Sequence, residues 1–146
     1  VAHCNGEYVL LLNNDTEMIL PSSLYEMVGY CQREDVGVVG AKLLFPNDTV
    51  QHAGVVIGFG SVAGHVFYGI NRKSDGYFNR AVVPGNWSAV TGACLMTKKS
   101  LYQQSGGLDE SLAVAFNDID YCLKIRSMNK LVVMNPFSLW YHYESV

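Results

Sequence analysis

Three polar clusters in this 146-residue sequence carry side chains that could bind or activate a ligand. The first, Asn13-Asn14-Asp15-Thr16, follows directly on the apolar run 8–12. Ligands in open α/β sheets collect at the carboxyl ends of strands. A carboxylate supported by amide side chains suits a hard divalent cation such as Mg²⁺ or Mn²⁺, which keeps positions open for water and phosphate oxygens. The same residue types also form ordinary turns, so the cluster alone supports both interpretations.

The second cluster, Asn117-Asp118-Ile119-Asp120, opens the best-defined predicted helix, for which Asn117 is the expected cap. Acidic side chains in a first helical turn are favoured by about 0.3–1 kcal/mol through the helix dipole alone, so stabilisation of the helix would also explain them. Positions two apart on a helix point in different directions. Asp118 and Asp120 therefore cannot form a close dyad, and we expect one to face a site and the other to be structural.

The third cluster, residues 140–144, is the polar and aromatic sequence WYHYE. His142 could offer a neutral imidazole to a cation, or it could be a packed or surface residue. His3, His52 and His65 show no metal-binding spacing, which indicates surface or loop positions. Gly92 predicts either a close approach of a ligand to the backbone or a plain bend.

The elements that must position these clusters follow an α/β pattern. Apolar runs predict strands at 8–12, 36–44, 87–96 and 130–134, the last stopped by Asn135-Pro136, and helical periodicity or caps mark 21–31, 100–105 and the segment after 117. Residues 50–83, with six glycines, predict short strands and loops. Buried apolar runs are typical of parallel strands. We therefore expect one domain with a mixed, mainly parallel sheet flanked by helices.

The composition of the chain limits the classes of function that it can have. The chain is 49% hydrophobic and 16% charged with a net charge of −3, which predicts a packed core and disfavours nucleic-acid binding. The apolar runs are far shorter than the ~20 residues of a membrane span, so a soluble protein is expected. Four cysteines without a C-x-x-C pair indicate reduced core thiols in the cytosol.

Five segments, taken in this order, resemble the family 2 glycosyltransferases, in particular the bacterial branch with rhamnosyltransferase-like enzymes. They are GEYVLLLNNDTE (6–17), VQHAGVVIG (50–58), VTGACLMTKKSL (90–101), GGLDESLAVAFNDIDYCLKIR (106–126) and WYHYES (140–145). The resemblance implies a GT-A fold, a nucleotide-diphosphate sugar donor, a saccharide or lipid-linked saccharide acceptor, a divalent cation (Mg or Mn) and inversion at the anomeric carbon. It also implies a role in cell-surface polysaccharide biosynthesis, in the cytoplasm or at the inner membrane face.

The resemblance assigns roles residue by residue. Asp15 matches the metal-diphosphate ligand, although Asn13 stands where relatives carry the first acid of an Asp-x-Asp motif. Asp118 matches the catalytic base of the later acidic motif, and His142 matches a histidine that completes the metal or diphosphate site. The donor and acceptor pocket is expected to include Asn13, Trp87, Gly92 and Asn117.

Relatives begin with a βαβ nucleotide-binding half, so residues 1–146 match the C-terminal portion of a GT-A domain, and about 60–90 residues would precede them. The fragment is then expected to be inactive alone, with an exposed sheet edge that a second copy could cover. Two alternatives stay open. Asn13 favours a non-catalytic carbohydrate-binding GT-A-like domain, and a sugar nucleotidyltransferase would need a glycine-rich phosphate loop ahead of these residues.

Overall fold

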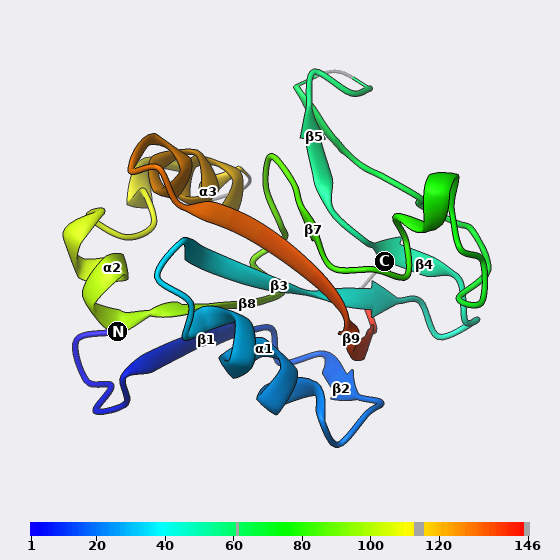
Figure 1. The fold of residues 1–146 in the computed structure, drawn as a ribbon, viewed down its shortest axis with the longest axis horizontal. Coiled ribbons are helices and arrows are strands. Elements are labelled where there is room, and N and C mark those ends of the chain that lie inside the picture. Colours follow the sequence, from blue (N-terminus) through cyan, green and yellow to red (C-terminus); the bar gives the residue numbers. More distant parts are fainter. Residues whose placement is uncertain (61, 113–115, 145–146) are drawn as a thin grey trace.

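The computed structural model describes residues 1–60, 62–112 and 116–144, which form an α/β fold (Figure 1). Its main sheet has seven strands in the order β1-β8-β3-β9-β2, with β4 beside β3 and β7 beside β9. These strands are β1 (Tyr8–Leu12), β2 (Thr16–Met18), β3 (Val36–Leu44), β4 (Val50–His52), β7 (Gly85–Asn86), β8 (Cys94–Lys98) and β9 (Leu131–His142). A separate hairpin pairs β5 (Val55–Ile57) with β6 (Ala63–His65).

The helices are α1 (Ser23–Cys31), α2 (Lys99–Gln104) and α3 (Asn117–Ser127), with short 3-10 turns at Tyr77–Asn79 and Glu110–Leu112. None of the helices within the described ranges is both long and apolar enough to cross a bilayer. Two of the matched segments extend past these ranges: positions 113–115 within 106–126, and Ser145 at the end of 140–145, lie outside the described residues.

The sheet is mixed, as expected, but the expectation of mainly parallel strands is wrong. Strands β3 and β9 run parallel, whereas β8 runs antiparallel to both of its neighbours, β1 and β3. Strands β2, β4 and β7 also pair antiparallel. A strand covered on both faces is apolar along its whole length whichever way its neighbours run. All nine residues of β3 are buried. Its apolar sequence therefore indicates that the strand is buried but does not indicate whether its neighbours run parallel or antiparallel to it.

Strand β9 continues past Pro136, where the sequence predicted its end. Ala41 of β3 lies opposite Asn135 and the next residue, Lys42, lies opposite Leu139, so residues 136–138 bulge out of the pairing. Proline has no N–H to donate, and such a bulge places it where no ladder bond is needed. The strand then resumes and brings His142 opposite Thr16 of β2, next to the first polar cluster.

Helices α1 and α3 cover opposite faces of the sheet (Figure 1). Val38 belongs to the apolar cluster that contains Ile125 of α3, whereas the adjacent Val39 belongs to the cluster around Met27 of α1. Neighbouring residues of a strand point to opposite faces, so the two clusters lie on the two sides. This three-layer packing holds the carboxyl end of β1, the first turn of α3 and the end of β9 in fixed relation.

Three of the four cysteines are buried in these layers, but Cys4 is exposed, which corrects the expectation of four core thiols. Burial raises the pKa of Cys31, Cys94 and Cys122 to about 12.

Because the thiolate is the reactive form, we expect the native protein to titrate one fast thiol with Ellman's reagent at pH 8 and all four after denaturation. Cys4→Ser should abolish the fast phase, and Cys31→Ser should leave it intact. Fast reaction of two or more thiols in the folded protein would contradict this packing.

Candidate functional site

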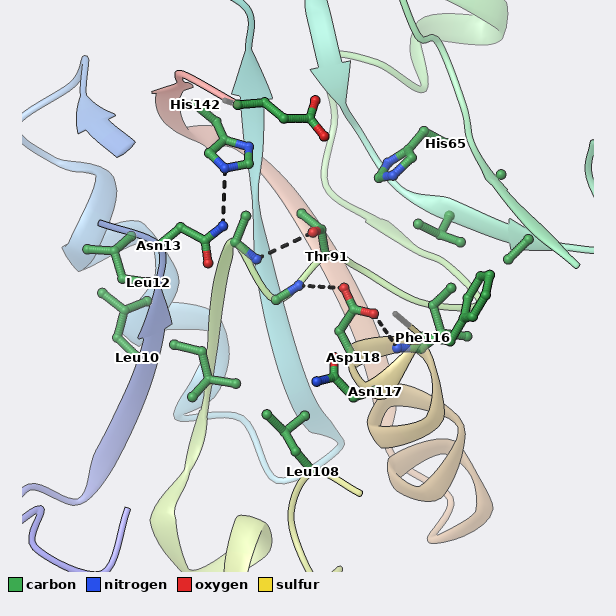
Figure 2. Close-up of a pocket in the computed structure, with 18 residues that line it drawn as sticks. Leu10, Leu12, Asn13, His65, Thr91, Leu108, Phe116, Asn117, Asp118 and His142 are labelled. Atoms are coloured by element: carbon green, nitrogen blue, oxygen red, sulfur yellow. Dashed lines mark hydrogen bonds between the residues drawn. The ribbon is translucent and has the colours of Figure 1, made fainter. Parts of the chain in front are cut away.

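A cavity of about 820 Å³ opens where the ends of β1 and β9 meet the first turn of α3 and residues 91–93 (Figure 2). It is lined by five of the seven residues singled out from the sequence: Asn13, Gly92, Asn117, Asp118 and His142. A sixth, Asp15, does not line the cavity but lies beside it, with its Oδ1 3.2 Å from Nε2 of the lining residue His142. Residues that are far apart in the chain therefore share one concave site, of a size usual for ligand pockets.

Trp87 is the seventh, and the structure places it in the core, outside the lining of the cavity. Its side chain is 6% exposed and packs edge-to-face on Phe67, with ring centroids 6.1 Å apart. The Arg80 guanidinium lies over the Trp87 ring, 4.4 Å from its centroid, a favourable cation–π arrangement. The indole supports the loops around the cavity and does not face its interior.

The cluster at residues 13–16 is both a turn and part of the site. Thr16 Oγ1 donates to the Asn13 carbonyl at 2.8 Å, and the Tyr143 N–H donates to the Asp15 carbonyl at 2.8 Å. The Asn13 N–H extends the pairing of β1 with β8 by bonding the Ala93 carbonyl at 3.0 Å. These contacts use Thr16 and backbone groups, so the Asn13 side chain remains free to line the cavity and the Asp15 side chain to approach His142.

His142 is held in one protonation pattern by a chain of side chains. Gln51 Nε2 donates to Glu144 Oε2 at 3.3 Å, which turns Gln51 Oε1 toward His142 Nδ1 at 2.7 Å. An amide oxygen only accepts, so Nδ1 carries the proton and Nε2 keeps its lone pair. Asn13 Nδ2 donates to that lone pair at 3.2 Å.

The carboxylate of Asp15 faces the same nitrogen. Its Oδ1 is inaccessible to solvent and has no hydrogen-bond donor among the described residues, although it lies 3.2 Å from His142 Nε2. In this tautomer Nε2 donates nothing to Asp15 Oδ1, and a buried carboxylate oxygen without a partner is costly. Either a second proton on His142 or a cation would remove this cost.

The spacing of Asp15 and His142 would suit a small divalent cation if the Asn13 amide left the Nε2 lone pair. Adjacent ligands of an octahedral ion with bonds of about 2.1 Å are separated by about 3 Å, close to the 3.2 Å between Asp15 Oδ1 and His142 Nε2. Within the described ranges no group of three His, Cys, Asp or Glu side chains converges on one point. The ion would hence take two strong ligands from the protein and leave its other positions to water and phosphate oxygens, as Mg²⁺ commonly does.

Asp118 lies on the other side of residues 91–93 and is tied to them. Its Oδ2 accepts the Gly92 N–H at 2.8 Å and its Oδ1 accepts the Ile119 N–H at 2.8 Å. A side chain at position 92 would bring Cβ to 3.3 Å from Asp118 Cβ, a tight contact that would push on the Asp118 side chain. The carboxylate is thus aimed at the cavity by two donors and still has lone pairs for a ligand.

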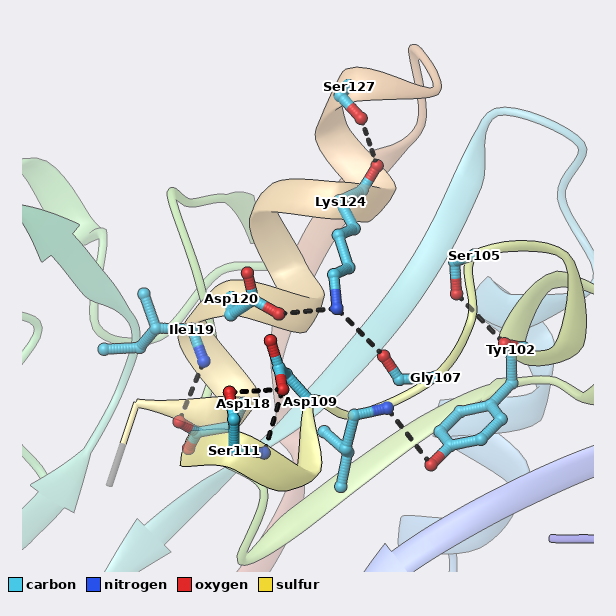
Figure 3. A network of polar contacts seen from close by, with 11 residues as sticks. Tyr102, Ser105, Gly107, Asp109, Ser111, Asp118, Ile119, Asp120, Lys124 and Ser127 are labelled. Carbon is cyan, nitrogen blue, oxygen red and sulfur yellow. Dashed lines mark hydrogen bonds and ion pairs between the residues drawn. The ribbon is translucent and has the colours of Figure 1, made fainter. Parts of the chain in front are cut away.

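The two acids of α3 diverge as their spacing predicted. Asp120 pairs with Lys124 at 2.7 Å, and Lys124 also donates to the Gly107 carbonyl at 3.4 Å (Figure 3). Asp120 is therefore structural. The expected cap is wrong in register: Phe116, with φ of 69°, occupies the cap position and Asn117 is the first helical residue.

The sequence did not indicate the histidine pair beside the cavity. His52, expected at the surface, is fully buried, and its Nδ1 lies 2.9 Å from Nδ1 of His65, which lines the cavity. Both histidines lie in the glycine-rich span 50–83 and have no metal-binding spacing. Nothing in the sequence therefore predicts that they pair, and only the fold brings them together. Burial, with a smaller effect of His65, holds the pKa of His52 well below its ordinary value. Partial burial also lowers the pKa of His65, against the opposing effects of Asp118 and Glu144.

Comparison with known proteins adds two relatives. The chain is 50% identical over 146 residues to the uncharacterized protein y4gI of Sinorhizobium fredii, covering 99% of this chain and 16% of that protein. It is 40% identical over 145 residues to the O-antigen biosynthesis protein RfbC of Myxococcus xanthus, covering 97% of this chain and 11% of that protein. The chain thus spans a small part of the length of both relatives. No protein-family model matches it.

Burial of His52 makes the free energy of unfolding depend on pH. Above pH ~6.5 His52 is neutral in both states; below it the unfolded chain takes up a proton that the folded protein refuses until the lower folded pKa is reached. The free energy of unfolding should therefore fall as the pH drops below ~6.5, by up to about 1.4 kcal/mol per pH unit for this one group. Urea denaturation at pH 7.5, 6.5 and 5.5 measures the slope.

His52→Asn should flatten that slope, whereas the matched change of the exposed His3 to Asn should retain it. An equal slope in the His52 variant and the unaltered protein would show that His52 is not the group responsible.

Proposed function

We propose that this chain is the C-terminal portion of a GT-A glycosyltransferase domain that moves a sugar from a nucleotide-diphosphate donor to a saccharide or lipid-linked saccharide acceptor with inversion. The observation that carries the proposal is one cavity lined by Asp118 on one side of residues 91–93 and by His142 on the other (Figure 2). Asp15 lies behind His142, with its Oδ1 3.2 Å from His142 Nε2. Similarity to a protein named for O-antigen biosynthesis supports a role in cell-surface polysaccharide assembly.

In the proposed reaction, an acceptor hydroxyl attacks the anomeric carbon from the face opposite the leaving nucleotide diphosphate, through an oxocarbenium-like transition state. Asp118 takes the hydroxyl proton as that bond forms. The N–H groups of Gly92 and Ile119 keep its carboxylate oriented without using all of its lone pairs. Asp15 and His142 would hold a Mg or Mn ion, whose positive charge would stabilise the departing diphosphate.

The sheet edge also bears on this proposal. Strand β1 is the outermost strand on its side of the sheet, and unpaired strand edges are normally covered. We propose that the nucleotide-binding strands of a complete GT-A domain, or a second copy of the chain, lie along β1. Catalysis would then take place in the cytoplasm or at the inner membrane face, where nucleotide sugars are the donors.

One observation favours a second candidate, a carbohydrate-binding domain without transfer activity. The Asn13 amide already donates to His142 Nε2, the lone pair that a cation would need. If that contact persists in solution, the cavity would bind a sugar with no cation. A measurement of metal binding separates the two candidates.

Asp15→Asn should weaken binding of Mn²⁺-loaded nucleoside diphosphate at least tenfold in isothermal titration calorimetry, because a neutral amide replaces the charged ligand. Asp35→Asn is the matched control, since Asp35 is exposed and pairs with Arg33 on the surface. Equal affinities of the Asp15 variant and the unaltered protein would favour the metal-free candidate.

Asp118→Asn, made in a protein that contains the complete domain, should reduce sugar transfer by about a hundredfold or more, since general base catalysis contributes factors of that order. Affinity for the donor should be retained. Asp120→Asn, two residues away and paired with Lys124, should keep near-normal transfer. Normal turnover of the Asp118 variant would refute its assignment as the base.

A further inference from the structure

A smaller polar pocket of about 190 Å³ adjoins the main cavity. The two share His65, Thr91, His142 and Glu144, and the smaller one is lined throughout by polar or titratable side chains. Its volume equals that of about six water molecules at ~30 Å³ each. This side pocket therefore has room for a polar group of a ligand, beyond a single bound water.

The hydrogen bonds of the histidine pair determine where its protons lie. The Thr91 N–H donates to His52 Nε2 at 3.4 Å, so this nitrogen carries a lone pair. His52 Nδ1 must then hold the ring proton, and it donates to His65 Nδ1 at 2.9 Å. The remaining proton of neutral His65 consequently lies on Nε2.

This pattern determines what His65 can offer the cavity. With Nδ1 engaged by His52, its remaining polar atom is the Nε2–H group, which donates and does not accept. Uptake of a proton at Nδ1 would set two N–H groups against each other at the 2.9 Å contact. His65 is therefore built to bind an oxygen atom of a ligand, and it is unsuited to act as the base in place of Asp118.

Glu144 supplies the complementary group in the same pocket. Its Oε2 accepts from Gln51 at 3.3 Å, and an ionised carboxylate only accepts. A hydroxyl both donates and accepts, so it satisfies an N–H donor and a carboxylate together, whereas a phosphate would be repelled by the Glu144 charge.

We propose that the side pocket is a subsite for a hydroxyl-bearing part of the sugar substrate, where His65 Nε2–H donates to a hydroxyl oxygen and Glu144 accepts the hydroxyl proton. His52 is a positioning residue that keeps the proton of His65 on Nε2. The choice of a sugar as the ligand rests on the proposed function. The subsite adds to that function two residues, His65 and Glu144, that would select the sugar.

The first test reads the protons directly. Long-range ¹H–¹⁵N spectra of the imidazoles should show His52 protonated on Nδ1 and His65 on Nε2 in the 146-residue chain. His52→Phe should release His65 into a mixture of both tautomers, with circular dichroism confirming the fold. A proton on Nδ1 of His65 in the unaltered protein would overturn the proposal.

The second test uses methyl glycosides of common hexoses and 6-deoxyhexoses as sugar probes and Mg²⁺ with inorganic diphosphate as the phosphate probe. His65→Phe should weaken binding of the best glycoside about threefold to tenfold, the usual effect of losing one hydrogen bond. His65→Gln, which keeps an N–H near the Nε2 position, should stay within about twofold, as should the matched control His3→Phe. Diphosphate affinity should change in none of the three.

The outcomes separate the subsite from the transferase. Glycoside binding that depends on His65, without diphosphate binding that depends on Asp15, would keep the subsite and refute the transferase. Diphosphate binding that depends on Asp15, with glycoside affinity unaltered in His65→Phe or undetectable throughout, would refute the subsite alone.

Discussion

The parallel pairing of β3 with β9 is the constraint on which the rest of the site depends. It fixes both central strands in the sheet, and the bulge at 136–138 lets β9 continue in register to His142. Without that continuation the imidazole would not lie beside Asp15 and Gln51. A local backbone irregularity in a buried strand thus decides whether His142 reaches the cavity at all.

Polar groups around the cavity are joined in two short relays whose directions follow from fixed donors. One runs from Glu144 through Gln51 to His142, and the other from the Thr91 backbone through His52 to His65. Each relay starts at a group that can only donate or only accept, so each leaves one ring nitrogen with a defined role. Nε2 of His142 carries a lone pair and accepts, whereas Nε2 of His65 carries a proton and donates. The two histidines are therefore not interchangeable. Such preorganised polar atoms are what a ligand site requires.

The short segment 91–93 connects the two halves of the site. Its backbone bonds Asn13 through the Ala93 carbonyl, His52 through the Thr91 N–H and Asp118 through the Gly92 N–H. Main-chain groups of residues 91–93 therefore position the side chains of His52 and Asp118 and the backbone of Asn13. Gly92 thus both donates to Asp118 and leaves space beside its side chain.

The sequence by itself determined the α/β class, the extent of β1 and β3, the presence of α1 and α3, and the polar clusters at strand and helix ends, because apolar periodicity and turn residues act over short distances. It also determined that Asp118 and Asp120 diverge, since helical geometry is local. Tertiary structure alone decided the strand directions, the passage of β9 through Pro136, and the burial of His52 against His65. These three features depend on which strands become neighbours in the fold. An apolar run or a single histidine does not identify the distant residues that it will contact.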